Sequence, residues 1–175
     1  SWGNARARLP WLFASWVGGV AAVAIIGVFK NMLETTVALA AFIPVIIGMG
    51  GNIGTQSSTI IVRGLATGRV DIGNNLKIII KEIKVGLILG VLYGLLLGVF
   101  ATLKFVNTTP YLGLIVALSI LSSMIISTFV GTLVPLLFRK LDIDPAIATG
   151  PFVTTSIDII GVTLYFLIAS ALIPV

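Results

Sequence analysis

Five long apolar stretches restrict the fold of this chain more than any other feature of its sequence. A helix needs about 20 apolar residues to cross the hydrocarbon core of a bilayer, and its backbone groups must be bonded within the segment. We therefore predict one all-α integral membrane domain comprising residues 1–175, a bundle of five spans. The longer stretches are expected to tilt or to be broken internally. The predicted spans are residues 9–29, 36–62, 85–103, 111–138 and 146–173.

The composition agrees with a bilayer environment. Charged residues make up 10% of the chain and hydrophobic residues 58%, whereas a soluble domain carries roughly 25% charged residues. Histidine and cysteine are absent, which leaves oxygen ligands for any bound metal and few groups for acid–base or nucleophilic chemistry. Enzyme activity is therefore not expected. Nucleic acid is not an expected partner either, because the basic residues lie between apolar spans.

The distribution of basic residues predicts the orientation. Cytoplasmic loops of membrane proteins carry an excess of lysine and arginine. If the N-terminus is cytoplasmic and the C-terminus is outside, only Lys30 and Lys104 lie outside. We therefore expect a multi-pass protein of the cell membrane with its N-terminus inside. The basic residues then inside are Arg6, Arg8, Arg63, Arg69, Lys77, Lys81, Lys84, Arg139 and Lys140.

Small residues recur at every fourth position in the third and fourth spans. Such stripes let helix backbones approach closely where no hydrophobic force operates between helices. They indicate packing seams, either within one chain or between two, so both spans are assigned to the scaffold. The stripes are Gly86, Gly90, Gly94 and Gly98 in the third span, and Ser119, Ser123, Ser127 and Gly131 in the fourth.

The polar link before the third span is predicted to be a helical extension of that span. Asp71 is a suitable N-cap, and Lys77, Lys81 and Lys84 fall on one helical face. We expect these lysines to face lipid headgroup phosphates. The alternative is a docking surface for a soluble regulatory domain.

The second span is unusually polar for a helix at membrane depth. Pro44 removes one backbone hydrogen bond, and the glycines that follow leave carbonyl oxygens open. Polar groups there need partners in the protein or water in a cavity. The alternative is a helix–helix interface built from small residues. The residues that share one helical face are Gly48, Asn52, Thr55, Gln56, Thr59 and Arg63.

Acidic residues lie just before the fifth span and within it. Asp144 suits an N-cap before Pro145, and Asp142 and Asp144 are alternatively a cation-attracting cytoplasmic mouth. Asp158 is the only acidic residue well inside any predicted span. A charge at the bilayer centre costs at least ~2.5–3.5 kcal/mol, so Asp158 is expected to bind an ion. The alternatives are an ion pair with Arg63 and a protonated aspartate. Two copies of Asp158 around a shared axis would match a divalent charge.

These two polar spans resemble the signatures of the MgtE family of magnesium transporters. The matching residues are Pro44 and 48–56 in the second span, and 144–146, 150–151 and 154–158 in the fifth. The resemblance implies a homodimeric channel for Mg²⁺, with a pore lined by the second and fifth spans of both subunits. It also implies that Asp158 is the ion-binding side chain. The accompanying ligands would be the backbone carbonyls of Gly48, Gly51 and Thr154.

The remaining pore-lining residues and partners follow from the same resemblance. Asn52, Thr55, Gln56, Gly150 and Thr155 would line a water-filled path. Full-length family members usually carry cytoplasmic regulatory domains before the first span. We expect these to be absent from this chain, which is then an excised pore domain or a short member. The alternatives are a secondary transporter that exchanges a divalent cation for Na⁺ or H⁺, and a noncatalytic membrane anchor.

Overall fold

The computed structural model describes residues 2–70 and 75–173, and these residues form helices without any strand. Five of the helices are long and apolar enough to cross a membrane, which confirms the predicted all-helical architecture. The predicted N-cap Asp71 lies outside the described residues. The helices are α1 (Trp2–Val28), α2 (Lys30–Thr35), α3 (Ala38–Ala66), α4 (Asn75–Lys104), α5 (Leu112–Lys140) and α6 (Pro145–Leu172).

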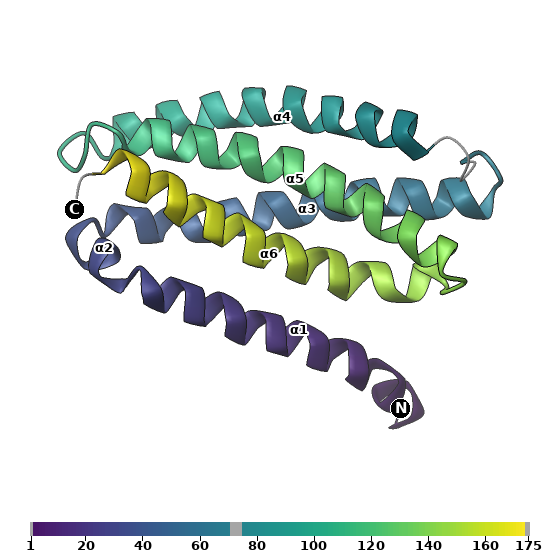
Figure 1. The fold of residues 1–175 in the computed structure, drawn as a ribbon. Helices are drawn as coiled ribbons and strands as arrows, with labels where there is room; N and C mark the ends of the chain where they lie inside the picture. The colour runs from purple at the N-terminus through teal and green to yellow at the C-terminus, as the bar shows by residue number, and fades with distance from the viewer. Residues whose placement is uncertain (1, 71–74, 174–175) are drawn as a thin grey trace.

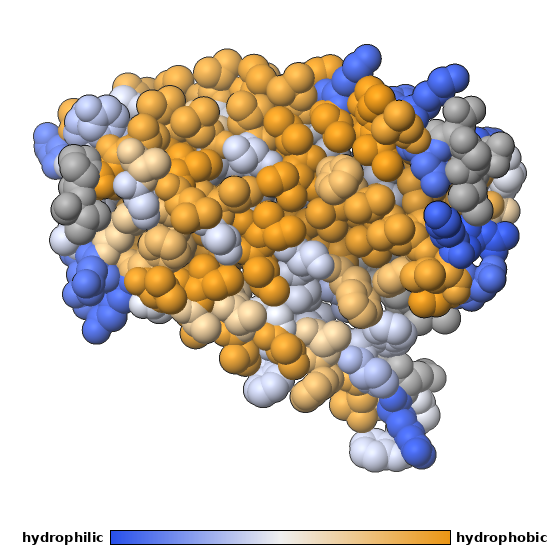
Figure 2. Space-filling view, in the orientation of Figure 1, coloured by the Kyte–Doolittle hydropathy of each residue, from blue (hydrophilic) through white to orange (hydrophobic). Residues whose placement is uncertain are grey.

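The long helices alternate in direction, so that the two ends of the chain lie at opposite ends of the bundle (Figure 1). α5 is the central helix and packs against α3, α4 and α6. α1 packs along α6 and diverges from the rest of the bundle (Figure 1). The face of the molecule seen in Figure 2 is mostly apolar along the helices and hydrophilic at the two ends, as expected of a bundle that spans a bilayer.

Several helices continue beyond the predicted spans. α4 already begins at Asn75, so the polar link does contain the predicted helical extension, and Lys77, Lys81 and Lys84 are all exposed on it. α3 runs without a break past Pro44 and its glycines, and so does α6 past Pro151. Of the two expected alternatives, tilting or an internal break, the break is therefore not formed in α3 or α6. The backbone stays helical because neighbouring helices support both segments along their length.

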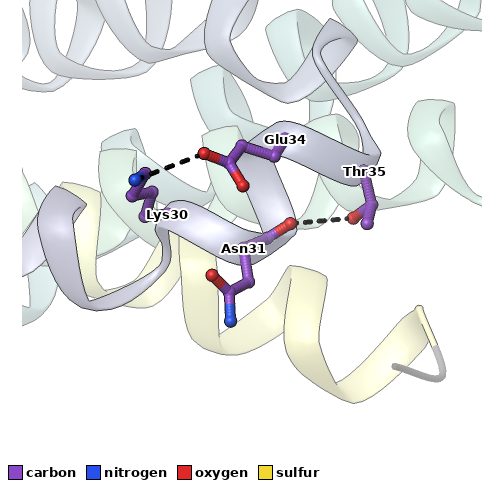
Figure 3. Close-up of polar contacts among 4 residues, drawn as sticks. All are labelled: Lys30, Asn31, Glu34 and Thr35. Atoms are coloured by element: carbon purple, nitrogen blue, oxygen red, sulfur yellow. Dashed lines mark hydrogen bonds and ion pairs between the residues drawn. The ribbon is translucent and has the colours of Figure 1, made fainter.

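The short helix α2 turns the chain from α1 into α3 and was not predicted. Lys30 and Glu34 form an exposed ion pair at 3.4 Å across one helical turn, and the hydroxyl of Thr35 donates a hydrogen bond to the carbonyl of Asn31 at 3.1 Å (Figure 3). Exposed pairs of this kind contribute only about 0.3–0.5 kcal/mol. Phe29, just before α2, stacks on Phe166 of α6, with ring centroids 4.7 Å apart. That stacking fixes the turn to the core.

The glycine stripe of α4 is a seam with α5 of the same chain. All four glycines are buried. A Cβ added at Gly94 would lie 2.8 Å from the carbonyl oxygen of Ala117, and one at Gly98 would lie 2.8 Å from that of Gly113. Only glycine allows so close an approach between the two backbones. Of the two alternatives for this stripe, packing within one chain is the one that the fold contains.

The second stripe, on α5, lies on the side of α5 that faces away from α4, and it packs against α3 and α6. A Cβ at Gly50 of α3 would lie within 3.1 Å of the hydroxyl oxygens of Ser123 and Ser127, and one at Gly131 would collide with the backbone of Gly54. α5 thus presents one small-residue face to α4 and another to α3. The first face supports the hairpin, and the second holds the polar helix α3 in place.

Candidate ion-binding site

The carboxylate of Asp158 lies at the junction of α3 and α6. These two helices pack against each other, and a Cβ added at Gly51 would lie 3.9 Å from Oδ1 of Asp158. Glycine therefore leaves room beside the carboxylate. Asp158 is only partly buried. The sole ion pair among the described residues is Lys30–Glu34, so the alternative pairing of Asp158 with Arg63 is not formed.

Asp158 opens into a cavity of about 350 Å³ between α1, α3 and α6. Asp158 is the only charged residue of its lining, and Thr154 and Thr155 of α6 supply hydroxyl groups. A side chain at Gly18 of α1 would collide with Thr155, so this threonine faces α1. The other lining residues are Ser15, Gly18, Gly19, Ala22, Val23, Ile26 and Ile47.

The described residues contain no cluster of three or more acidic, histidine or cysteine side chains that would cage a bare metal ion. One chain thus offers a cation one carboxylate at this point, together with neutral oxygens. Such a donor set suits a hard cation that keeps part of its water shell.

The polar face predicted on α3 is not covered by the rest of the chain. All of its predicted members are exposed, and the buried residues lie on the opposite side of the helix. Thr55, Gln56 and Thr59 also line a shallow depression of about 280 Å³. The alternative of a small-residue packing interface is therefore wrong for this face within the chain. The exposed members are Gly48, Asn52, Thr55, Gln56, Thr59 and Arg63.

One predicted site glycine on each of these two helices faces open space. An added Cβ at Gly48 or at Gly150 would meet no atom within 4 Å. The hydroxyl of Thr154 donates a hydrogen bond to the carbonyl of Gly150 at 2.9 Å. Gly48, Gly51 and Thr154 all lie within unbroken helix. Carbonyls in regular helix accept a bond from the fourth following residue, so each would offer a cation only its second lone pair.

The acidic start of α6 is a helix cap. Oδ1 of Asp144 accepts a hydrogen bond from the backbone N–H of Ala146 at 2.9 Å, and Pro145 is the first helical residue. This confirms the predicted capping role. Asp142 is exposed and adopts a left-handed backbone conformation with φ of 57°. Asp144 also lines a cavity of about 310 Å³ together with Arg139 and the end of α3.

Two residues with buried polar contacts were missed from the sequence. Glu82 of α4 accepts a hydrogen bond from the hydroxyl of Ser57 at 2.8 Å. Tyr165 donates one to the carbonyl of Leu39 at 2.8 Å. A signal for Glu82 does exist, because it continues the every-fourth-residue stripe of Gly86 and the glycines after it. Glu82 lies three residues before the predicted third span, in the part of the helix Asn75–Lys104 that extends beyond it.

Comparisons with known proteins agree with this architecture. The family model MgtE, described as a divalent cation transporter, matches residues 43–168, from α3 into α6. "Magnesium transporter MgtE" of Bacillus subtilis is 37% identical over 166 residues, which is 95% of this chain and 36% of that protein. The proteins of the same name from Thermus thermophilus and Enterococcus faecalis are each 35% identical with the same coverage.

This chain thus spans about a third of the length of these relatives, 36%. The family match includes the polar face of α3 and Asp158 of α6, the two parts of the candidate site. The chain is a membrane domain with five candidate spans, and it belongs to the MgtE family of divalent cation transporters.

Proposed function

We propose that this domain passes hydrated Mg²⁺ across the cell membrane through a pore lined by α3 and α6 of two copies of the chain. The observation that carries the proposal is the uncovered polar face of α3 beside the partly buried carboxylate of Asp158. Lipid cannot satisfy those polar groups, whereas water and a cation can. The relatives named as magnesium transporters support the choice of ion.

Two arguments support a second copy of the chain: the charge of the ion, and the need to shield the polar face of α3 from lipid. One Asp158 carries a single negative charge, and two around a twofold axis match a divalent cation. A second chain seated on this side would also remove the polar face of α3 from lipid. A symmetric dimer is the commonest way for a surface to cover itself.

The donor groups fit an ion that keeps its water. Mg²⁺ dehydrates reluctantly and prefers octahedral oxygen coordination. In the proposal Asp158 is the central ligand, and it and the backbone carbonyls contact the water shell. Asp142 and Asp144 attract cations at the cytoplasmic mouth, with the N-terminus inside. The carbonyls are those of Gly48, Gly51 and Thr154, and the rest of the path is lined by Asn52, Thr55, Gln56, Gly150 and Thr155.

The continuous helical backbone of α3 and α6 favours a channel over an exchanger. Secondary transporters typically bind ions at discontinuous helices, and both α3 and α6 are continuous through the proposed path. We therefore expect Mg²⁺ flux that does not depend on a Na⁺ or H⁺ gradient. Flux that vanishes when both of those gradients are removed would support the exchanger instead.

The central test is Mg²⁺ flux into liposomes that contain the wild type or Asp158→Asn. The asparagine keeps the shape of the side chain and removes its charge, so we expect flux to fall at least tenfold at equal amounts of folded protein. Glu34→Gln is the matched control, because Glu34 is exposed on α2 and pairs only with Lys30. Undiminished flux in Asp158→Asn would refute the central role of this residue and favour the membrane-anchor alternative.

A further inference from the structure

Two side-chain hydrogen bonds link different membrane-spanning helices in the described part of the chain, and both end on α3. The hydroxyl of Tyr165 in α6 donates to the carbonyl of Leu39 at 2.8 Å. The hydroxyl of Ser57 donates to Oε2 of Glu82 in α4 at 2.8 Å. Leu39 precedes the polar segment of α3, and Ser57 lies within that segment on its buried side. The polar helix is thus held at its start and again beside the residues that face the proposed path.

The hydrogen bond that Glu82 accepts is unusual because of the helix on which Glu82 lies. α4 packs chiefly along α5 and has no comparable packing with α3. Glu82 and Ser57 are nevertheless only 9% and 2% exposed. A buried carboxylate in an apolar bundle is unfavourable, and the next members of the same stripe are glycines that fill the seam with α5. Packing alone does not require an acidic residue at position 82.

Ser57 occupies the side of α3 that faces away from the proposed path. Ile53 and Ile61, one turn before and after it, are buried with it, whereas its neighbours Thr55 and Gln56 are exposed. Successive residues of a helix are about 100° apart. Rotation of α3 by that angle would therefore exchange buried residues for exposed ones along the polar face.

We propose that Glu82 is a positioning residue for the ion path. Through Ser57, and together with the packing of Gly50 and Gly54 on α5, it fixes the rotation of α3 about its own axis, so that Asn52, Thr55 and Gln56 face the ion. The inference rests on the proposed function, in which α3 lines the pore. It adds a residue on α4, a helix outside the pore wall, that controls which side chains the ion meets.

The first test measures rotation directly and needs no transport. The sequence contains no cysteine, so a single cysteine at Thr55 or at Ile53 reports one face of α3 by its reaction rate with a charged, water-soluble maleimide. We expect the Thr55→Cys protein to react at least tenfold faster than the Ile53→Cys protein. Adding Glu82→Ala should reduce the ratio of the two reaction rates, that of Thr55→Cys to that of Ile53→Cys, at least threefold. Adding Glu82→Gln should preserve it, because the amide oxygen still accepts from Ser57.

The second test measures selectivity. Glu82→Ala and Ser57→Ala should each change the ratio of Mg²⁺ to Ca²⁺ flux in liposomes at least threefold, and Ser57→Thr, which retains the hydroxyl, should restore it. The double alanine variant should be no worse than either single one, because both remove the same bond. Loss of stability alone would lower both fluxes together and leave their ratio unchanged.

The outcomes separate this inference from the proposed function. If the labelling ratio survives in both Glu82→Ala and Ser57→Ala, the positioning role is wrong. An unchanged flux ratio in both variants would also overturn it. If Asp158→Asn retains full flux while Glu82→Ala still collapses the labelling ratio, the proposed pore is wrong but the restraint on α3 stands. Size-exclusion profiles of Glu82→Ala, Glu82→Gln and Ser57→Ala verify that the compared proteins are folded, and Ser57→Ala carries the test if Glu82→Ala does not fold.

Discussion

The α4–α5 pair and the open faces of the α3–α6 pair use the same small residue in opposite ways. Gly94 and Gly98 of α4 are buried, and an added Cβ would press on the backbone of α5. At Gly48 of α3 and Gly150 of α6 an added Cβ would meet nothing within 4 Å. Glycine brings α4 and α5 together, and Gly54 of α3 packs in the same way against Ile157 of α6, whereas Gly48 and Gly150 leave space beside their helices. The spacing of glycines alone does not distinguish a seam from an open wall.

The polar side chains distinguish the two pairs better than the glycines do. Thr128 and Thr132 of α5 donate to carbonyls of their own helix, so they can be buried without a partner on another helix. Asn52 and Gln56 of α3 form no side-chain hydrogen bond with any residue that the structure describes. An amide has more donors and acceptors than one helical turn can satisfy. Amides at membrane depth therefore indicate water or a ligand more strongly than hydroxyls do.

The largest effect is expected from breaking the seam with Gly94→Leu. The leucine side chain has no space, because even its Cβ would lie 2.8 Å from the carbonyl oxygen of Ala117, so α4 and α5 must separate. We expect most of the protein to be lost from the monodisperse peak after extraction. Gly27→Leu is the control, since a Cβ there meets nothing within 4 Å. Equal yields and unfolding temperatures for the two variants would contradict a tight seam.

An intermediate effect is expected on the open wall from Gly48→Ala. The added methyl group has space, so the unfolding temperature should not fall. It does narrow the proposed path, and we expect Mg²⁺ flux to fall about three- to tenfold, which corresponds to about 0.7–1.4 kcal/mol. Gly27→Ala, outside the proposed path, should keep wild-type flux. Wild-type flux in Gly48→Ala would show that Gly48 does not line the ion path.

The smallest effect is expected at the mouth, where Asp144 has two possible roles. Asp144→Ala removes the cap of α6 and should lower stability by about 1 kcal/mol, measured by thermal unfolding. Asp144→Ser keeps a capping oxygen and should restore stability. If the charge also attracts cations, both variants should lose up to about twofold in flux at low ionic strength, and the loss should disappear in high salt. Unchanged flux in Asp144→Ser at low salt would show that Asp144 caps α6 and does not attract cations.

Sequence patterns predicted the elements whose cause is local. Apolar length predicted the five spans, and Asp144 with Pro145 predicted the start of α6. The residues that were missed depend on other helices. Glu82 lies in the predicted helical extension of the third span, but its hydrogen bond with Ser57 depends on how α4 lies beside α3. The bond from Tyr165 to Leu39 joins residues 126 positions apart, and no local pattern indicates it. Orientation and dimerisation stay predictions.

The seam between α4 and α5 also has a consequence for how the chain folds. Gly98 lies opposite Gly113, and only a short loop separates them, whereas the contact of Gly54 with Gly131 closes a much longer segment of chain. Membrane helices insert first and associate afterwards, and short loops close at the smallest entropic cost. We therefore expect the α4–α5 hairpin to assemble first and to serve as the template on which α3 and α6 dock. Faults in that hairpin would therefore act before an ion path exists.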